Sequence, residues 1–263
     1  MRGVPTPLPG WSAHALDDAP DVLRAIHKDY ASAGASVHTT NTFRTRRAVF
    51  GDRWEELARK AVRLVRESIP AGQRVAGSIA PLEDCYRPDL SPATSDPGAT
   101  RAEHRALAEI LADEGCDILL CETFPHLGEA EIAMEEALAT GVETWVSWTA
   151  GPAGDLLTPA AVAPAAERAV QAGAAALLVN CVPAGLTLPF VEILATAASG
   201  RAEVGAYANA GCANDTSGFD IDAIDVDLYA DLAASWHAAG ATILAGCCGT
   251  GPAHVAALAK RLA

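Results

Sequence analysis

The chain has 263 residues, of which 50% are apolar and 20% charged, and its formal net charge at pH 7 is −14. An acidic surface argues against a nucleic-acid partner, because phosphate binding needs a basic surface. Seven cysteines, an odd number in a chain of this length, argue against a secreted disulfide scaffold. Residues 1–11 lack the apolar segment of a signal peptide, and the uncharged run 171–191 is interrupted by proline, glycine and asparagine. We therefore expect a cytoplasmic protein with reduced thiols.

Seven short apolar segments of β-type composition are predicted to be strands. In chain order they are 37–40, 74–79, 118–121, 144–148, 176–180, 204–207 and 243–245. Their recurrence, with longer helical patterns between them, is typical of repeated βα units. The interiors of these segments are continuously apolar, as expected for parallel strands that are buried on both faces.

Six helices are predicted from apolar periodicity and from residues that start or stop helices. They are 17–33, 52–69, 102–114, 158–173, 225–239 and 252–262. Asp52 and Glu55, three residues apart, resemble a capping box, and Thr158 followed by Pro159 predicts an N-cap. Gly173 is predicted to end the helix that Thr158 begins.

Neither a composition shift nor a linker divides the chain, so residues 1–263 are predicted to form a single domain. Repeated βα units favour either a doubly wound sheet or a (β/α)8 barrel. A closed barrel of this kind needs eight strands, but only seven are found. Residues 1–36 contain a proline-rich segment and a helix but no convincing strand.

Polar residues gather where the predicted strands end. In parallel α/β folds these carboxyl ends share one face, and active sites form there. Asn41, Thr42, Ser147 and Asn209 lie at such ends, and we predict that they support a substrate-binding mouth. Polar turn chemistry explains these residues almost as well.

Three cysteines also lie at strand ends, Cys181 after one strand and the adjacent Cys247 and Cys248 after the last. Three thiolates at one mouth suit zinc and leave its fourth position open for substrate. Cysteine also fills space in protein cores, and adjacent cysteines can form a strained redox disulfide. The residues alone therefore leave packing, redox chemistry and zinc binding open. The remaining cysteines are predicted to be core or incidental residues: Cys85, Cys116, Cys121 and Cys212.

Seven segments together resemble the homocysteine S-methyltransferase family, whose members are zinc-dependent (β/α)8 TIM barrels. The segments are SAHALDDAPDVLRAIHKDYASAGASVHTTNTFRT (12–45), AGSIAPLEDCY (76–86), DILLCETFPH (117–126), WVSWTAGPAGDLLTP (145–159), LLVNCVP (177–183), GAYANAG (205–211) and LAGCCGTGPAHV (244–255). They span almost the whole chain in the family's order, and the combination of NC with GCCGT is highly specific. The resemblance implies that Cys181, Cys247 and Cys248 bind Zn²⁺.

The resemblance also implies a reaction. The thiol of homocysteine would take the open zinc position and be deprotonated there, and the thiolate would attack the methyl group of a sulfonium donor to give methionine. The donor would be S-methylmethionine or S-adenosylmethionine. Glu122 matches a family position that contacts the amino group of homocysteine. We therefore expect an enzyme of methionine biosynthesis with small-molecule substrates, and neither nucleic acid nor membrane as a partner.

The sequence departs from the family pattern at its start. Family members begin with a strand that carries an Asp-Gly-Gly type motif, and this sequence begins after that strand, so we expect a barrel without it. One alternative is therefore an N-terminally truncated, catalytically impaired zinc-binding homologue, and another is a methyltransferase for a different thiol or selenol. A third is a different barrel enzyme, such as a lyase, whose cysteines only fill the core.

Overall fold

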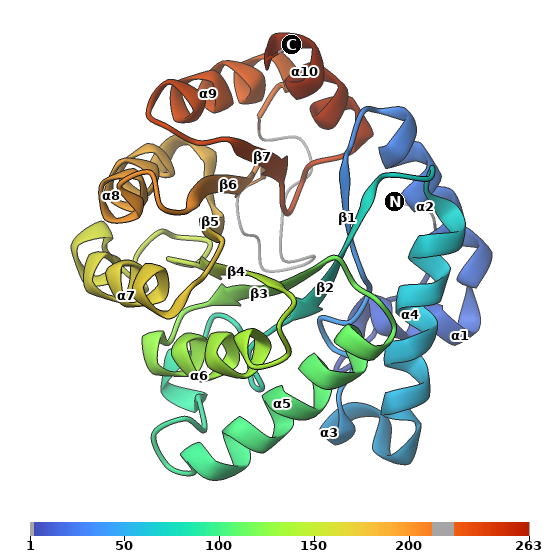
Figure 1. Ribbon diagram of the computed structural model, residues 1–263. Helices are drawn as coiled ribbons and strands as arrows, with labels where there is room; N and C mark the ends of the chain where they lie inside the picture. Colours follow the sequence, from blue (N-terminus) through green and yellow to red (C-terminus); the bar gives the residue numbers. More distant parts are fainter. Residues whose placement is uncertain (1–2, 212–223, 263) are drawn as a thin grey trace.

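The computed structural model describes residues 3–211 and 224–262, and the strands within these ranges form one curled sheet (Figure 1). Each strand runs parallel to its neighbours, and the strands follow one another in chain order. They are β1 (Val37–Thr39), β2 (Arg74–Ile79), β3 (Ile118–Phe124), β4 (Glu143–Trp148), β5 (Ala176–Pro183), β6 (Glu203–Asn209) and β7 (Ile243–Gly246). All seven predicted strands are confirmed, and β3, β5 and β6 continue beyond their predicted ends.

Helices surround the outer face of the sheet (Figure 1). In the described part of the chain they are α1 (Ala15–Asp18), α2 (Pro20–Ser32), α3 (Arg47–Phe50), α4 (Trp54–Ser68), α5 (Pro97–Asp113), α6 (Leu127–Leu138), α7 (Pro159–Ala172), α8 (Leu188–Ala198), α9 (Val226–Ala238) and α10 (Pro252–Leu262). Short 3₁₀ turns lie at Trp11–His14, Gly51–Arg53, Pro88–Leu90 and Ala184–Leu186. None of these helices is both long and apolar enough to cross a membrane.

Both ends of helix α7 are as predicted. The Thr158 hydroxyl accepts a hydrogen bond from the backbone N–H of Ala161 and caps α7. Gly173, with φ of 104°, ends the same helix in a left-handed conformation that glycine adopts without strain. The sequence signals at both ends of α7 are therefore confirmed.

Three predictions about helix starts are wrong. The predicted helix 17–33 is broken at Ala19, whose φ of −151° and ψ of 51° separate α1 from α2. Asp52 forms no capping box, because it lies in the 3₁₀ turn and α4 starts after Arg53 without a side-chain cap. Helix α5 starts at Pro97 rather than residue 102, because the Asp96 carboxylate caps the backbone N–H of Ala99 at 2.9 Å.

Apolar side chains pack on both faces of the sheet. The larger cluster fills the space between the strands and the surrounding helices, and includes the fully buried Leu111, Leu177 and Trp236. A smaller cluster lies on the concave inner face. Its members include Ile118, Leu120, Trp145, Leu178 and Tyr207. The interiors of β2 to β6 are thus buried on both faces, which explains why their sequences are largely apolar, whereas the edge strands β1 and β7 are only partly buried.

Cysteines outside the predicted zinc set are buried, as predicted. Cys85, Cys116 and Cys121 expose 2%, 5% and 0% of their surface. Burial raises the pKa of the Cys85 and Cys116 thiols to about 12, so both stay protonated at neutral pH. Cys212 lies outside the described residues.

The sheet does not close on itself within the described residues. Among the described strands, β1 pairs only with β2, and β7 pairs only with β6. The expected (β/α)8 barrel is thus observed as a curl of seven strands, and an eighth strand is not found in the described ranges. The helix layer does close, because α2 contacts α10. Gly34, just after α2, lies so close to α10 that a Cβ atom added to it would be 3.1 Å from the Cβ of Ala259.

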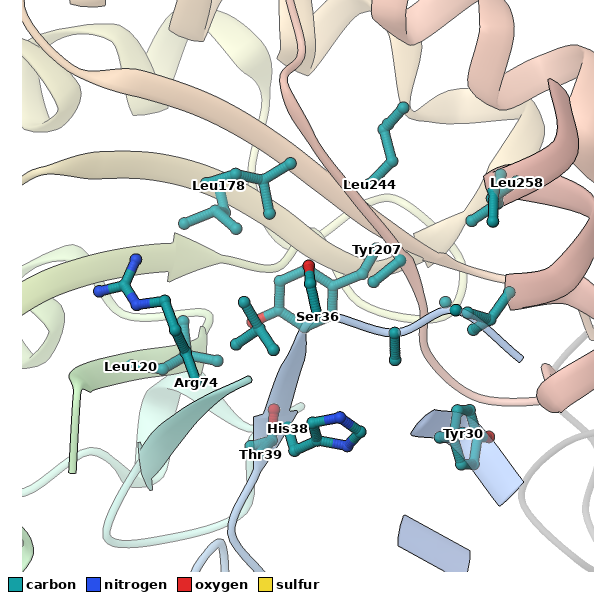
Figure 2. A pocket seen from close by; sticks show the side chains of 18 of the residues that line it. Tyr30, Ser36, His38, Thr39, Arg74, Leu120, Leu178, Tyr207, Leu244 and Leu258 are labelled. Atoms are coloured by element: carbon teal, nitrogen blue, oxygen red, sulfur yellow. The ribbon is translucent and has the colours of Figure 1, made fainter. Parts of the chain in front are cut away.

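A pocket of about 910 Å³ lies at the seam between β1 and β7 (Figure 2). Residues of α2, β1, β7 and α10 line it, and it reaches inward to Leu120, Leu178 and Tyr207 on the concave face of the sheet. The inner apolar cluster is therefore accessible from the side of the sheet.

Candidate metal centre

The three cysteines predicted to bind zinc lie together at the carboxyl ends of β5 and β7. Their Sγ atoms are within 4.8 Å of one another. Cys181 and Cys247, with Cα atoms 5.6 Å apart, are joined as a disulfide, and Cys248 is a free thiol. Three thiolates held at about 2.3 Å from one tetrahedral zinc lie about 3.8 Å apart. The cluster, once reduced, therefore has the size and the donor chemistry of a zinc site with one open position.

A tight turn after β7 places Cys247 and Cys248 beside the end of β6. The backbone N–H of Cys247 donates to the carbonyl of Ala208 at 2.8 Å, and the carbonyl of Cys248 accepts from the N–H of Ala210 at 2.9 Å. Gly249 follows with φ of 78°, and a Cβ on it would lie 2.7 Å from the backbone nitrogen of Gly211. Glycine is required at position 249 for two reasons. Its backbone has a positive φ, and any side chain there would collide with the backbone after β6.

The carboxylate of Glu122, predicted to contact substrate, is buried in the same region. It is 9% exposed, and both of its oxygens accept hydrogen bonds from other strands. The Ser78 hydroxyl donates to Oε1 at 2.5 Å, and the Tyr207 hydroxyl donates to Oε2 at 3.2 Å. Burial raises the pKa of Glu122, and the two hydrogen bonds oppose that rise because they favour the ionised form.

Asn41 and Thr42, predicted to support substrate binding, use their polar atoms within the protein. Asn41 exchanges two hydrogen bonds with Ser12, which tie the N-terminal 3₁₀ turn to the loop after β1. The Thr42 hydroxyl, in a residue that is 1% exposed, donates to the carbonyl of Ser78 at 2.7 Å. A substrate contact for either residue stays a prediction.

Ser147 and Asn209 are buried near the cysteines. The Ser147 hydroxyl donates to Oδ1 of Asn180 at 2.7 Å. Oδ1 of Asn209 accepts from the backbone N–H of Cys248 at 3.2 Å, so Asn209 helps to hold the cysteine turn. Nδ2 of Asn209 is buried and has no hydrogen-bond partner among the described residues, so it is a donor beside Cys248 that a bound molecule could satisfy.

Ser78, Asn180 and Tyr207 lie outside the predicted residue set but complete the hydrogen bonding of the site. Their positions at strand ends are visible in the sequence. Their partners are not, because each bond joins residues that are 33 to 85 positions apart and depends on the register of the strands.

A family model described as homocysteine S-methyltransferase matches residues 4–262. The chain belongs to the homocysteine S-methyltransferase family. The resemblance inferred from the sequence motifs is thereby confirmed. Members of this family are methyltransferases, so the reading as a lyase with core cysteines is set aside.

Individual family members match over nearly the whole chain. A homocysteine S-methyltransferase of Escherichia coli is 32% identical across 95% of this chain and 87% of its own length. Homocysteine S-methyltransferase 4 of Zea mays is 29% identical across 95% of this chain and 82% of its own length.

The fold also matches solved structures of a family member. The metallated form of the homocysteine methyltransferase MmuM from Escherichia coli superposes with a TM-score of 0.80 at 27% identity, covering 99% of this chain and 91% of that one. Its oxidized form superposes with a TM-score of 0.76 at 29% identity, with the same coverage. The curled sheet is therefore the TIM-barrel-like scaffold of a homocysteine methyltransferase.

Proposed function

We propose that this chain, as one domain, transfers a methyl group from a sulfonium donor to the thiol of homocysteine and so forms methionine, in a zinc-dependent reaction. S-Methylmethionine and S-adenosylmethionine are the donors that fit this chemistry. The observation that carries the proposal is the meeting of Cys181, Cys247 and Cys248, with Sγ atoms within 4.8 Å of one another, at the strand ends.

The three cysteines would hold the zinc ion. When bound, zinc supplies a Lewis acid that lowers the pKa of a coordinated thiol. Burial raises the pKa of Cys248 to about 11 in the protein without metal, so its thiol must lose a proton when the ion binds. Asn209 holds Cys248 in place, because Oδ1 of Asn209 accepts a hydrogen bond from the backbone N–H of Cys248.

Glu122 would bind the ammonium group of homocysteine. A carboxylate has about four lone-pair sites, and Ser78 and Tyr207 occupy one on each oxygen, which leaves acceptor capacity for a cation. The two hydroxyls come from β2 and β6, so they fix the carboxylate from both sides. This orientation would aim the homocysteine sulfur towards the cysteine cluster.

Methyl transfer from a sulfonium needs no proton donor. The homocysteine sulfur forms a bond to the methyl carbon while the donor's sulfur–methyl bond breaks, and the electron pair returns to the donor sulfur. The leaving group is then a neutral thioether. The site therefore needs a positioned thiolate and a buried surface for the donor, and it needs no general acid.

A second candidate is a zinc-binding homologue with impaired turnover. The open seam between β1 and β7 favours it, because that seam lies beside the turn that carries Cys247 and leaves one wall of the mouth incomplete in the described residues. This candidate predicts zinc binding without methyl transfer.

The test compares reduced wild-type protein with Cys247→Ala and with Cys116→Ala, a matched substitution of a buried cysteine away from the cluster. We expect about one zinc per chain in wild type and in Cys116→Ala, and none in Cys247→Ala. Wild type and Cys116→Ala should form methionine from homocysteine and S-methylmethionine, and Cys247→Ala should not. Zinc without methionine formation would favour the second candidate, and well-folded wild type without zinc would contradict both.

A further inference from the structure

The two strands that carry Glu122 and Cys181 share an irregularity. The pairing register of β3 shifts between Cys121 and Phe124, and that of β5 shifts between Asn180 and Pro183. Each bulge contains a residue with positive φ, Thr123 at 63° and Cys181 at 52°. Such values are uncommon outside glycine, and for a β-branched residue like threonine they are exceptional. Bulges re-aim side chains, and here one contains Glu122 and Thr123 while the other contains Cys181.

The side chain of Asn180 joins these two bulges. Its Oδ1 accepts from the backbone N–H of Thr123 at 3.0 Å, and its Nδ2 donates to the Thr123 hydroxyl at 2.7 Å. Oδ1 also accepts from Ser147 on β4, the strand that lies between β3 and β5. All three residues are at most 1% exposed. Since β3 and β5 share no backbone ladder, Asn180 makes a connection that the sheet itself does not provide.

Without Asn180 the bulge of β3 would lose a partner for a buried backbone N–H. An unpaired buried amide is costly, so the strained conformation of Thr123 depends on the groups that satisfy it. A change at Asn180 would therefore let Thr123 relax and move Glu122, its neighbour in the chain. The same change would loosen the backbone at Cys181, which follows Asn180 directly.

We propose that Asn180 is a positioning residue that couples the bulge of β3 to the bulge of β5 and so fixes the Glu122 carboxylate relative to the Cys181 thiol. This inference rests on the proposed function for the roles of those two residues. Asn180 contacts neither the ion nor homocysteine in this scheme, and it acts through Thr123 and through its own backbone.

The first variant is Asn180→Ala, which removes all three hydrogen bonds. Thr123→Val removes only the hydroxyl bond and keeps the side-chain shape. Thr144→Val is its matched control, because Thr144 is also a buried threonine in a strand, 1% exposed, and its hydroxyl bonds the nearby carbonyl of Val142.

Three measurements separate positioning from stability. Zinc affinity is measured by competition with a chromophoric chelator, thiolate coordination by the absorption spectrum of the Co²⁺-substituted protein, and catalysis by the KM and kcat for homocysteine. We expect Asn180→Ala to weaken zinc binding about 10–100-fold and to alter the Co²⁺ spectrum. Its KM for homocysteine should rise about tenfold, and Thr123→Val should raise KM about fivefold, while Thr144→Val changes none of these values.

Wild-type zinc affinity, Co²⁺ spectrum and KM in a folded Asn180→Ala protein would overturn the inference. If Asn180→Ala does not fold, Thr123→Val decides: a KM equal to that of Thr144→Val overturns the inference, and a raised KM supports it. If the wild type binds zinc but forms no methionine, the proposed function fails, and the zinc affinity and Co²⁺ spectrum still decide the role of Asn180.

Discussion

The Tyr207 hydroxyl on β6 donates a hydrogen bond to Oε2 of Glu122 on β3, 3.2 Å away across the concave face of the sheet. The donor and acceptor are 85 positions apart in the chain. A buried carboxylate stays ionised only when such donors stabilise its charge. The charge of Glu122, and with it the affinity for an ammonium group, therefore depends on a residue from the far side of the curl.

Tyr207→Phe should raise the KM for homocysteine about tenfold with a smaller change in kcat, because a hydrogen bond to a charged group contributes about 1.5–3 kcal/mol. It should also raise the pKa of Glu122 further. The pH below which KM begins to climb should then move upward in the variant. Initial rates between pH 5 and 9 check both effects.

Tyr229→Phe is the matched control for Tyr207→Phe. The Tyr229 hydroxyl bonds the carbonyls of Ala208 and Ala245, so its loss should lower the free energy of unfolding by about 1–2 kcal/mol. The pH profile of KM should stay that of the wild type. A Tyr207→Phe profile identical to that of Tyr229→Phe would contradict the role given to Tyr207.

Gly249→Ala should weaken zinc binding, because the added Cβ would lie 2.7 Å from the backbone nitrogen of Gly211 and the residue has a positive φ. The turn must shift, and Cys247 and Cys248 shift with it. Gly251→Ala is a close control, since no atom of the described residues lies within 4 Å of a Cβ at that position. Chelator competition should give at least a tenfold loss for Gly249→Ala and wild-type affinity for Gly251→Ala; equal affinities would show that the turn is not needed.

Zinc binding should require a reductant. The disulfide between Cys181 and Cys247 uses two of the three sulfur ligands, so the oxidised protein cannot present three thiolates. Protein treated with diamide should lose two titratable thiols and bind no zinc, and dithiothreitol should restore both. In Cys181→Ala, diamide should not remove the two thiols of the Cys181–Cys247 pair. Wild-type protein that binds zinc equally well before and after oxidation would contradict the assignment of these cysteines as zinc ligands.

Stability should fall as the pH decreases from about 6.5 to 4. Burial lowers the pKa of His27 to about 4, and His38, whose ring centroid is 6.1 Å away, adds to the shift. Below pH 6.5 the unfolded chain binds a proton that the folded protein does not, so unfolding becomes easier until the pH reaches the folded pKa. The effect is at most about 3 kcal/mol. Urea unfolding of His27→Gln should show a weaker pH dependence over this window, and an unchanged slope would count against a neutral, half-buried His27 in the folded protein.

Much of the scaffold follows from local sequence patterns. Buried parallel strands carry continuous apolar runs, so 74–79 is predicted with its observed limits as β2. Thr158 and Gly173 bracket α7 because caps act within a few residues. The carboxyl ends of parallel strands share one face, so the sequence predicts that Cys181, Cys247 and Cys248 lie near one another, and the family resemblance assigns these three cysteines to zinc.

The remaining features depend on contacts between distant segments. Helices α6 and α8 are not predicted, because burial on several sides makes much of each helix apolar or alanine-rich and weakens the periodic signal. The bulge at Thr123 is satisfied by Asn180, 57 positions later, and local propensity contains no trace of it. The capping-box pattern at Asp52 is misleading, since the preceding Gly51 takes φ of 54° and directs the chain into a 3₁₀ turn.

The three predicted metal ligands differ in how firmly the sheet holds them, because one side of β7 is unpaired among the described residues. Cys181 belongs to an interior strand with neighbours on both sides, whereas Cys247 and Cys248 follow an edge strand held by β6 alone among the described residues. Edge strands open at lower free energy than central ones. An ion bound by all three cysteines would therefore act as a clasp that fastens this edge to the middle of the sheet. Metal exchange would then be coupled to local opening of the C-terminal βα unit, at a rate governed by the ladder between β6 and β7, the one ladder that holds this edge among the described residues.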